Sequence, residues 1–478
     1  MINIRIFRSN ERLVGVPIGL FRARPPSRLV ASSLAGAPPM NLGRPRHLLI
    51  PLFCIFAYFV TILISETTMT ATQELKFPKE RIRLGVLTFF LAQGLCFSSW
   101  ASRIPDIRAI FEVDYALYWG MVLFLIPVGK FVAIPLAGYL ISKLGSRVMV
   151  QASVMGYGLS LLAIGLSRHI ALLGLCLFCF GVFWNLCDIS LNTQGIGIER
   201  LYGRTIMASF HGAWSLAACF GALIGFLMIV GEVTPMWHFT LIAIVIALIV
   251  LLGRKYLQED VAAAPDEPAG EATKPREAPA LLSFIRKPEG LLIQLGIVGL
   301  FALIVESAMF DWSGIYFESV VQAPKSLQIG FLVFMVMMTV GRFLTNYAYA
   351  RLGKRHVLQL AGFLIFAGFM LCGLIGGSIA SMGWKVAVNS LGFMLVGLGI
   401  SCMVPTIYSL VGAKSKTPVG LALTILSSIS FIGSLVAPLL IGAISQFFNM
   451  EYAYVIVGLL GLCILVMTTF CDAFKTND

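Results

Sequence analysis

Long apolar stretches, separated by short polar interruptions, run along most of the chain. Twelve of them are close to the roughly 20 residues that an α-helix needs to cross the hydrocarbon core of a bilayer. They cover residues 84–101, 116–139, 148–166, 170–191, 207–230, 237–253, 290–310, 327–349, 357–375, 384–411, 419–444 and 453–471. The strands of a membrane β-barrel would instead alternate apolar and polar positions. The pattern therefore predicts an all-α polytopic membrane protein with twelve transmembrane helices.

One long polar interruption divides the twelve stretches into six and six. Residues 254–289 are rich in proline and charged residues, the composition of a solvated linker. We therefore expect an N-terminal six-helix bundle over 80–253, a C-terminal six-helix bundle over 290–472 and a short cytoplasmic tail over 473–478. Residues 1–79 form an N-terminal leader that contains one further apolar stretch, 48–65.

The composition leaves no room for a soluble catalytic domain. Of the 478 residues, 58% are hydrophobic and 12% are charged, and the mean hydropathy is +0.89. The sequence contains no P-loop motif, metal-ligand cluster or nucleophile constellation, so we expect a protein that is not an enzyme and has no metal or cofactor. The formal net charge of +12 indicates basic loops at a membrane surface, not a nucleic-acid partner.

The basic residues are unevenly placed. Sixteen lie in loops and termini on the same side as the linker and five on the opposite side. The positive-inside rule therefore predicts that both ends of the twelve-helix body lie in the cytoplasm. The leader departs from this rule, because eight arginines precede or flank its apolar stretch. Three hypotheses stay open for it: translation from Met69, a targeting leader, or an extra helix of unusual orientation.

Two short segments recur in the same order in both halves. Val128-Gly129-Lys130-Phe131 precedes Leu144-Gly145-Ser146-Arg147, and Val340-Gly341-Arg342-Phe343 precedes Leu352-Gly353-Lys354-Arg355 with four residues less between them. Four residues are about one helical turn. A six-helix unit used twice is typical of transporters that rock two bundles about a central site.

The stretch from residue 138 to 147 resembles the loop signature of the major facilitator superfamily. The glycines and cations of that signature stand here at Gly138, Lys143, Gly145 and Arg147, whereas Ser142 occupies the place of its usual acid. The resemblance implies the major facilitator fold, with two pseudo-symmetric six-helix bundles, and a gating or structural role for these residues.

A narrower resemblance is to the fucose permease branch of that superfamily and to a related group of poorly characterised bacterial inner-membrane permeases. Residues 401–410, which include Pro405, are similar to the Pro-Thr-Ile-aromatic-Ser-Leu run of fucose permeases. Asp188 and Asn192 are similar to that branch's acid, three residues, asparagine. Fucose permeases also have an acid in the first helix, where this chain offers Gln93 and two serines.

A few polar side chains interrupt the apolar stretches. An ionised side chain at the bilayer centre costs about 2.5 to 3.5 kcal/mol, so it needs a partner, a cavity or a function. Asn185, Asp188 and Asn192 follow the spacing of one helical face, which we expect to line a central cavity. Asp188 can then exchange a proton or contact the substrate, while the alternative is a fixed ion pair with Lys130.

Two later helices carry the other charges. Glu306 is deep enough to be a second proton or substrate site, whereas Asp311, five residues on, faces another side near the external mouth. Arg342 and Asn346 belong to one polar stripe. Arg342 can bind an anionic substrate group or pair with Glu306. The alternative is that Arg342 and Lys130 extend toward the cytoplasmic face and serve gating.

Glu199 and Arg200, in the loop after the fourth helix, are expected to be gate or solvated charges. The whole pattern predicts a secondary active transporter that moves a small polar solute, a sugar or related metabolite, by alternating access and proton symport. Its partners are the solute, protons and the lipid bilayer, and we expect a monomer. Two alternatives stay open: proton-coupled efflux of drugs or metabolites, and a transporter-like receptor that binds without transport.

Overall fold

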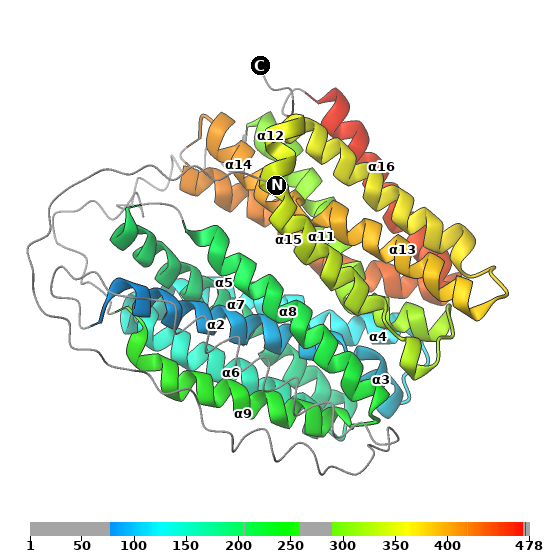
Figure 1. Ribbon diagram of the computed structural model, residues 1–478, viewed down its shortest axis with the longest axis horizontal. Coiled ribbons are helices and arrows are strands. Elements are labelled where there is room, and N and C mark those ends of the chain that lie inside the picture. Colours follow the sequence, from blue (N-terminus) through cyan, green and yellow to red (C-terminus); the bar gives the residue numbers. More distant parts are fainter. Residues whose placement is uncertain (1–76, 204–205, 259–288, 418, 472–473, 475–478) are drawn as a thin grey trace, which may run out of the picture. The chain divides into compact units, whose positions relative to one another are not determined.

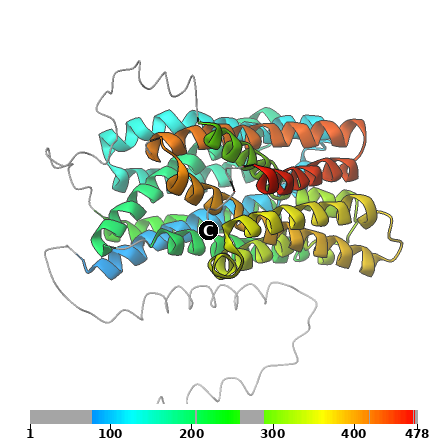
Figure 2. The same ribbon diagram turned by 90° about the horizontal axis from the view of Figure 1, so that it is seen from above.

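A computed structural model of the chain describes residues 77–203, 206–258, 289–417, 419–471 and 474. The apolar stretch 48–65 and most of the leader and of the linker therefore lie outside the described residues. In the described part, every regular element is a helix. Figure 1 colours the helices of the first half from blue to green and those of the second half from light green to red. Figure 2 shows the same helices from above, running alongside one another.

The first half contains eight α-helices among the described residues. They are α2 (Lys79–Ala101), α3 (Ile104–Ile110), α4 (Ala116–Leu123), α5 (Leu125–Leu144), α6 (Ser146–Leu166), α7 (Ile170–Tyr202), α8 (Met207–Val230) and α9 (Pro235–Gly253), followed by the 3-10 turn η1 (Arg254–Tyr256). α4 and α5 form one predicted crossing that is interrupted at Phe124, shortly before Pro127, whose nitrogen cannot donate a helical hydrogen bond. α7 extends well beyond the predicted 170–191 stretch.

The second half begins with α11 (Gly290–Ser319) and the 3-10 turn η2 (Lys325–Leu327). It continues with α12 (Gly330–Met370), the π-helical turn η3 (Leu371–Gly376), α13 (Met382–Ser401), α14 (Met403–Lys414), α15 (Val419–Phe447) and α16 (Met450–Phe470). The predicted stretch 384–411 is thus two helices that divide at Cys402. Pro405 follows this division, where it removes one helical donor.

Eleven helical stretches of the described chain are long and apolar enough to cross a membrane. One of them, Lys325–Gly376, has 52 residues and contains a non-helical residue, Gly353, with φ 74° and ψ 156°. This stretch supplies two crossings, so the eleven stretches correspond to twelve. The all-helical polytopic fold of two six-helix bundles is therefore confirmed.

Burial differs between the inner and the outer helices. Every residue of α2 from Phe89 to Ala101 is buried, because neighbouring helices α7, α8 and α9 pack around it. By contrast, leucines of the outer helices are exposed, among them Leu159 on α6, Leu251 on α9 and Leu391 on α13. In a bilayer such side chains face acyl chains as apolar as themselves, so their exposure carries no hydrophobic penalty.

The two halves meet through a limited set of helices: α4 and α5 pack on α15, α8 packs on α12, and α2 and α3 pack on α11. α4 and α15 approach closely, since a Cβ atom added to Gly120 would lie 2.4 Å from the Pro438 carbonyl oxygen. We call the end of the bundles that carries η1 and the start of α11 the linker end, and the opposite end the distal end. At the distal end the Lys325 ammonium lies 3.2 Å from a Glu232 carboxylate oxygen, joining the halves.

The sequence repeat is also a repeat of backbone conformation. Gly145, between α5 and α6, has φ 81° and ψ 157°, nearly the values of Gly353 inside α12. Residues with a Cβ are strongly disfavoured in this region of φ/ψ space, so both turns at the linker end depend on glycine.

We expect Gly145→Ala and Gly353→Ala each to lower the free energy of unfolding by about 1 to 3 kcal/mol, because each forces a Cβ into that region. The measurement is the thermal unfolding midpoint of the detergent-purified protein. Gly138→Ala is the matched control: Gly138 is helical and an added Cβ would meet nothing within 4 Å, so it is expected to be neutral or stabilising. Unchanged midpoints for both loop variants would contradict the prediction.

Candidate functional site

Five charged side chains from four helices gather where the two halves meet. We call Lys130 on α5, Asp188 on α7, Glu306 and Asp311 on α11 and Arg342 on α12 the central cluster. All three carboxylates are close enough to the Lys130 ammonium for Coulombic interaction. The Arg342 guanidinium lies 3.9 Å from a Glu306 carboxylate oxygen. Asp311, expected near a mouth of the protein, is therefore part of the same group as Glu306.

Asp188 is held by a neutral partner. The Gln93 amide on α2 donates to the Asp188 carboxylate over 3.3 Å. Gln93 is only 1% exposed, and its Oε1 has no hydrogen-bond partner within the described residues. No ion pair between Lys130 and Asp188 is formed in the described part of the chain. Asp188, itself half-buried, thus keeps a carboxylate that no cation neutralises by direct contact.

Lys130 rests on an aromatic ring. Its ammonium nitrogen lies 3.1 Å from the centroid of the Trp184 ring, within the range of a cation–π interaction. The Asn185 amide donates to the Lys130 carbonyl oxygen over 2.7 Å, so it ties α7 to α5. Asn185 and Asp188 of the predicted face thus both contact another helix, whereas Asn192 is half-buried. Asn346, of the predicted stripe that contains Arg342, is exposed.

Arg342 connects the two halves directly. Its guanidinium donates to the Ser215 hydroxyl of α8 over 2.6 Å and lies 5.4 Å from the Trp214 ring centroid. One turn earlier on α12, the Thr339 hydroxyl lies 3.2 Å from the Ser215 carbonyl oxygen. Arg342 is therefore held in the centre of the protein and does not extend to the linker end.

Aromatic rings pack against one another between the two cations. The Phe97 ring centroid lies 4.8 Å from Trp184 and 5.6 Å from Trp214 in the first half, and 4.6 Å from Phe310 in the second. We call Phe97, Trp184, Trp214 and Phe310 the aromatic wall. Sequence reasoning missed it, although Trp184 stands four residues before Asp188 and so shares its helical face.

The loop-signature residues lie at the linker end, apart from the central cluster. The Lys143 ammonium is 5.8 Å from the Tyr139 ring centroid, and the Arg147 guanidinium lies 3.5 Å from the Arg254 carbonyl oxygen. Gln194 on α7 adds a contact that the sequence did not indicate: its amide donates to the Ser146 hydroxyl over 2.8 Å and exchanges two hydrogen bonds with the backbone of Gln258.

Glu199 acts as a helix cap. Its carboxylate accepts hydrogen bonds from the backbone N–H groups of Ile206 and Met207 over 2.6 and 2.8 Å, at the start of α8. A carboxylate at this position also interacts favourably with the helix dipole. Arg200, the next residue, is exposed.

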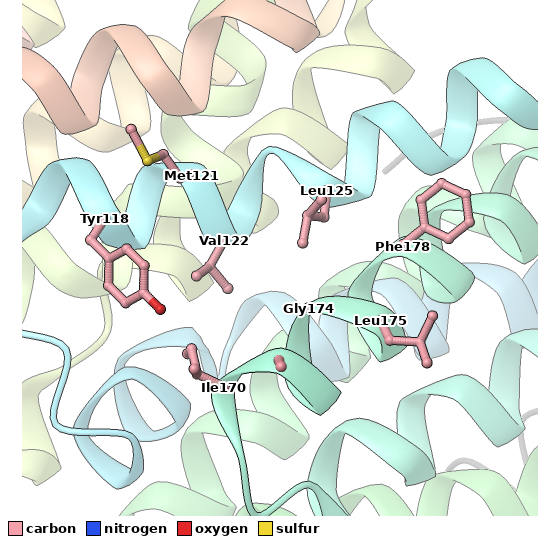
Figure 3. A pocket seen from close by; sticks show the side chains of 9 residues that line it. Tyr118, Met121, Val122, Leu125, Ile170, Gly174, Leu175 and Phe178 are labelled. Carbon is pink, nitrogen blue, oxygen red and sulfur yellow. The ribbon is translucent and has the colours of Figure 1, made fainter.

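An apolar groove lies elsewhere, between α4, α5 and the start of α7. It has a volume of about 490 Å³, and Figure 3 shows its lining side chains, of which only Tyr118 carries a polar atom. With no group to orient a polar solute, this groove has the chemistry of a lipid-facing surface, and the central cluster is the candidate site.

Two bundles of membrane-crossing helices around one charged cluster define a polytopic secondary transporter. The family model of the Major Facilitator Superfamily matches residues 119–418, and the chain belongs to this family. It is 27% identical to an uncharacterised transporter of Sinorhizobium fredii over 80% of this chain and 96% of that protein. It is 29% identical to an uncharacterised MFS-type transporter of Yersinia pestis over 79% of this chain and 92% of that protein.

A solved structure shares the fold. The nucleoside transporter NupG matches with a TM-score of 0.63, over 83% of this chain and all of the other, at 12% sequence identity. A mutant form of NupG matches with a TM-score of 0.66 at 11% identity. At this identity the likeness concerns the fold alone. The narrower resemblance to the fucose permease branch stays a prediction.

Removing the cap at Glu199 should affect stability and leave the central cluster unchanged. We expect Glu199→Ala to lower the free energy of unfolding by about 0.5 to 2 kcal/mol, because two N–H groups of α8 lose their acceptor. The thermal unfolding midpoint measures this. Arg200→Ala, at an exposed neighbour, should change stability by no more than about 0.5 kcal/mol. Equal midpoints for the two variants would mean that the cap contributes nothing.

Proposed function

We propose that the protein imports a small polar solute, a sugar or related metabolite, together with protons across the inner membrane. The observation that carries this proposal is the environment of Asp188. Its carboxylate lies among charges from both halves, is half-buried, and has the neutral Gln93 amide as its hydrogen-bond partner. A carboxylate in this position can accept a proton without first breaking an ion pair.

The contacts between the halves support alternating access. At the distal end the halves are joined by the pair of Lys325 and Glu232 and by the close crossing at Gly120. Nearer the centre, the bond from Arg342 to Ser215 joins them again. A rocking motion that opens the distal end has to break these contacts, and a solute bound between the halves can replace the central one.

The direction of the protein in the membrane follows from its charges. Basic side chains lie along the linker end of both halves, where we place the cytoplasm: Lys79, Arg83, Arg147, Arg254, Lys255, Arg351, Lys354 and Lys414. In this orientation the described conformation is closed toward the outside, and import corresponds to release at the linker end. A deletion strain that fails to accumulate the solute supports import, whereas a strain hypersensitive to toxic compounds supports export.

The coupling role of Asp188 can be tested in proteoliposomes with a solute found by a thermal-shift screen of sugars, sugar acids and polyols. We expect Asp188→Asn to abolish uptake driven by a pH gradient, because the amide cannot carry the proton, while solute exchange without a gradient persists. Initial rates of uptake and of solute-dependent proton influx are the measurements.

Asp114→Asn is the matched control, since Asp114 is an exposed residue of a distal loop and the chemical change is the same. It should keep uptake coupled to the gradient. Gradient-driven uptake by Asp188→Asn at the wild-type rate would exclude Asp188 as the coupling group.

A further inference from the structure

The two cations of the central cluster stand at the two ends of the aromatic wall. Lys130 lies over Trp184 and Arg342 lies beside Trp214, while Phe97 contacts both indole rings. Phe310 extends the wall into the second half. Phe97 and Phe310 are buried, whereas Trp184 and Trp214 are partly exposed, so the two indoles are the part of the wall that a flat or cyclic group can meet, with a cation beside each.

The two cations differ in how far their hydrogen-bonding capacity is used. Arg342 donates to Ser215 and faces Glu306 at 3.9 Å. Lys130 has three N–H donors, and within the described residues its recorded side-chain contact is the Trp184 ring, with no ion pair. Because a ring face accepts weakly compared with a carboxylate, Lys130 retains donors for a charged acceptor.

The charge balance of the cluster indicates which acceptor fits. Two cations, Lys130 and Arg342, face three carboxylates, Asp188, Glu306 and Asp311, so the cluster carries an excess of one negative charge when all are ionised. One proton on a carboxylate of the cluster brings the balance to zero and removes one of the three negative charges near Lys130. When a monoanion binds together with that proton, the net charge of the cluster and solute is the same as the net charge of the empty cluster.

Other titratable groups of the first half lie near Asp188. Tyr157 on α6, Cys187 on α7 and His211 on α8 interact electrostatically with it, and Cys96 on α2 lies beside Tyr157. None of them is a carboxylate, so Asp188 remains the acid of the first half that lies near Lys130.

We propose that the solute is a monocarboxylate with a ring or flat apolar face, bound with its carboxylate on Lys130 and its face on the aromatic wall. This deepens the proposed proton-coupled transport and rests on it. The alternative is a solute with an amine. However, Lys130 and Arg342 already lie against the two indole rings, and their positive charges would repel a protonated amine at the aromatic wall.

Binding of matched solutes to the detergent-purified full chain tests this class. The probes are three trios that share a ring and differ in one group: benzoate, benzyl alcohol and benzylamine; cyclohexanecarboxylate, cyclohexylmethanol and cyclohexylmethylamine; and glucuronate, glucose and glucosamine. Each is offered up to about 10 mM, enough to reveal a millimolar Kd by thermal shift. We expect the carboxylate of at least one trio to bind about tenfold or more tightly than its alcohol and amine, as a charge-assisted hydrogen bond allows.

Variants assign the preference to the site. Lys130→Gln should remove the tighter binding of the carboxylate. Lys255→Gln is the matched control and should keep it. Lys255 also lies over an aromatic ring, with its ammonium 4.9 Å from the Tyr256 ring centroid, but at the linker end. Lys130→Arg retains the charge and should retain the preference, which guards against loss through misfolding. In the wild type, carboxylate affinity should rise by up to about tenfold per unit fall in pH, the limit for one proton taken up with the ligand. Asp188→Asn removes one of the three negative charges near Lys130, so it should bind the carboxylate more tightly than the wild type does at neutral pH.

The proposal is overturned if alcohols or amines bind as tightly as carboxylates, if Lys130→Gln keeps the preference, or if no member of any trio binds. Binding is measured in detergent without a gradient, so these results do not test proton-coupled transport, which the uptake assay in proteoliposomes tests separately. Conversely, a carboxylate-selective site in a protein that shows no gradient-driven uptake would overturn the proposed function and keep the assignment of the site.

Discussion

The free-energy cost of placing charge in hydrocarbon is the constraint on which the arrangement of this protein depends. Its central cluster brings together five ionisable side chains that no single helix could keep away from lipid. Each is held by a group of another helix or lies within reach of opposite charge: Asp188 by Gln93, Lys130 by the Trp184 ring, and Arg342 by Ser215 and Glu306. The bundles therefore have to pack with these faces inward. The outer helices present leucine side chains to the acyl chains of the lipid.

The same constraint bears on how the two halves hold together. In lipid, helix association depends on close packing and hydrogen bonds, since apolar surface gains little by burial. The crossing of α4 and α15 at Gly120 and Gly442 uses backbone proximity, and Arg342 and Thr339 use hydrogen bonds to α8. Contacts of both kinds therefore join two bodies that have to change their relative tilt.

Sequence reasoning reached the fold and one side of the site. Apolar length alone predicted the crossings, because each helix must span the bilayer whatever it packs against. Helical spacing placed Asp188 and Asn185 on one face from local geometry alone, and the role of that face as a cavity lining stays a prediction. The partners of these residues could not be predicted in the same way. Trp184 meets Lys130 from 54 positions away along the chain, and Ser215 meets Arg342 across the two halves.

The apolar pattern could not predict the local interruptions of the helices either. The division at Cys402 and the glycine turn inside α12 leave hydropathy almost unchanged, so only proline and glycine positions could indicate them. Glu199 was expected to be a gate or solvated charge, because nothing in its sequence context shows that the chain returns to place two N–H groups of α8 against it.

The two glycine turns at the linker end are alike in conformation but unequal in position. Gly145 follows Gly129 by 16 residues, whereas Gly353 follows Gly341 by 12, and four residues of helix measure about 6 Å. A rotation that exchanged the halves would therefore not superimpose their linker ends. Because the pseudo-symmetry is broken there, nothing obliges the two tilted forms of the protein to be equally populated. The length of a single helix can therefore determine which of the two forms is more populated when no solute is bound.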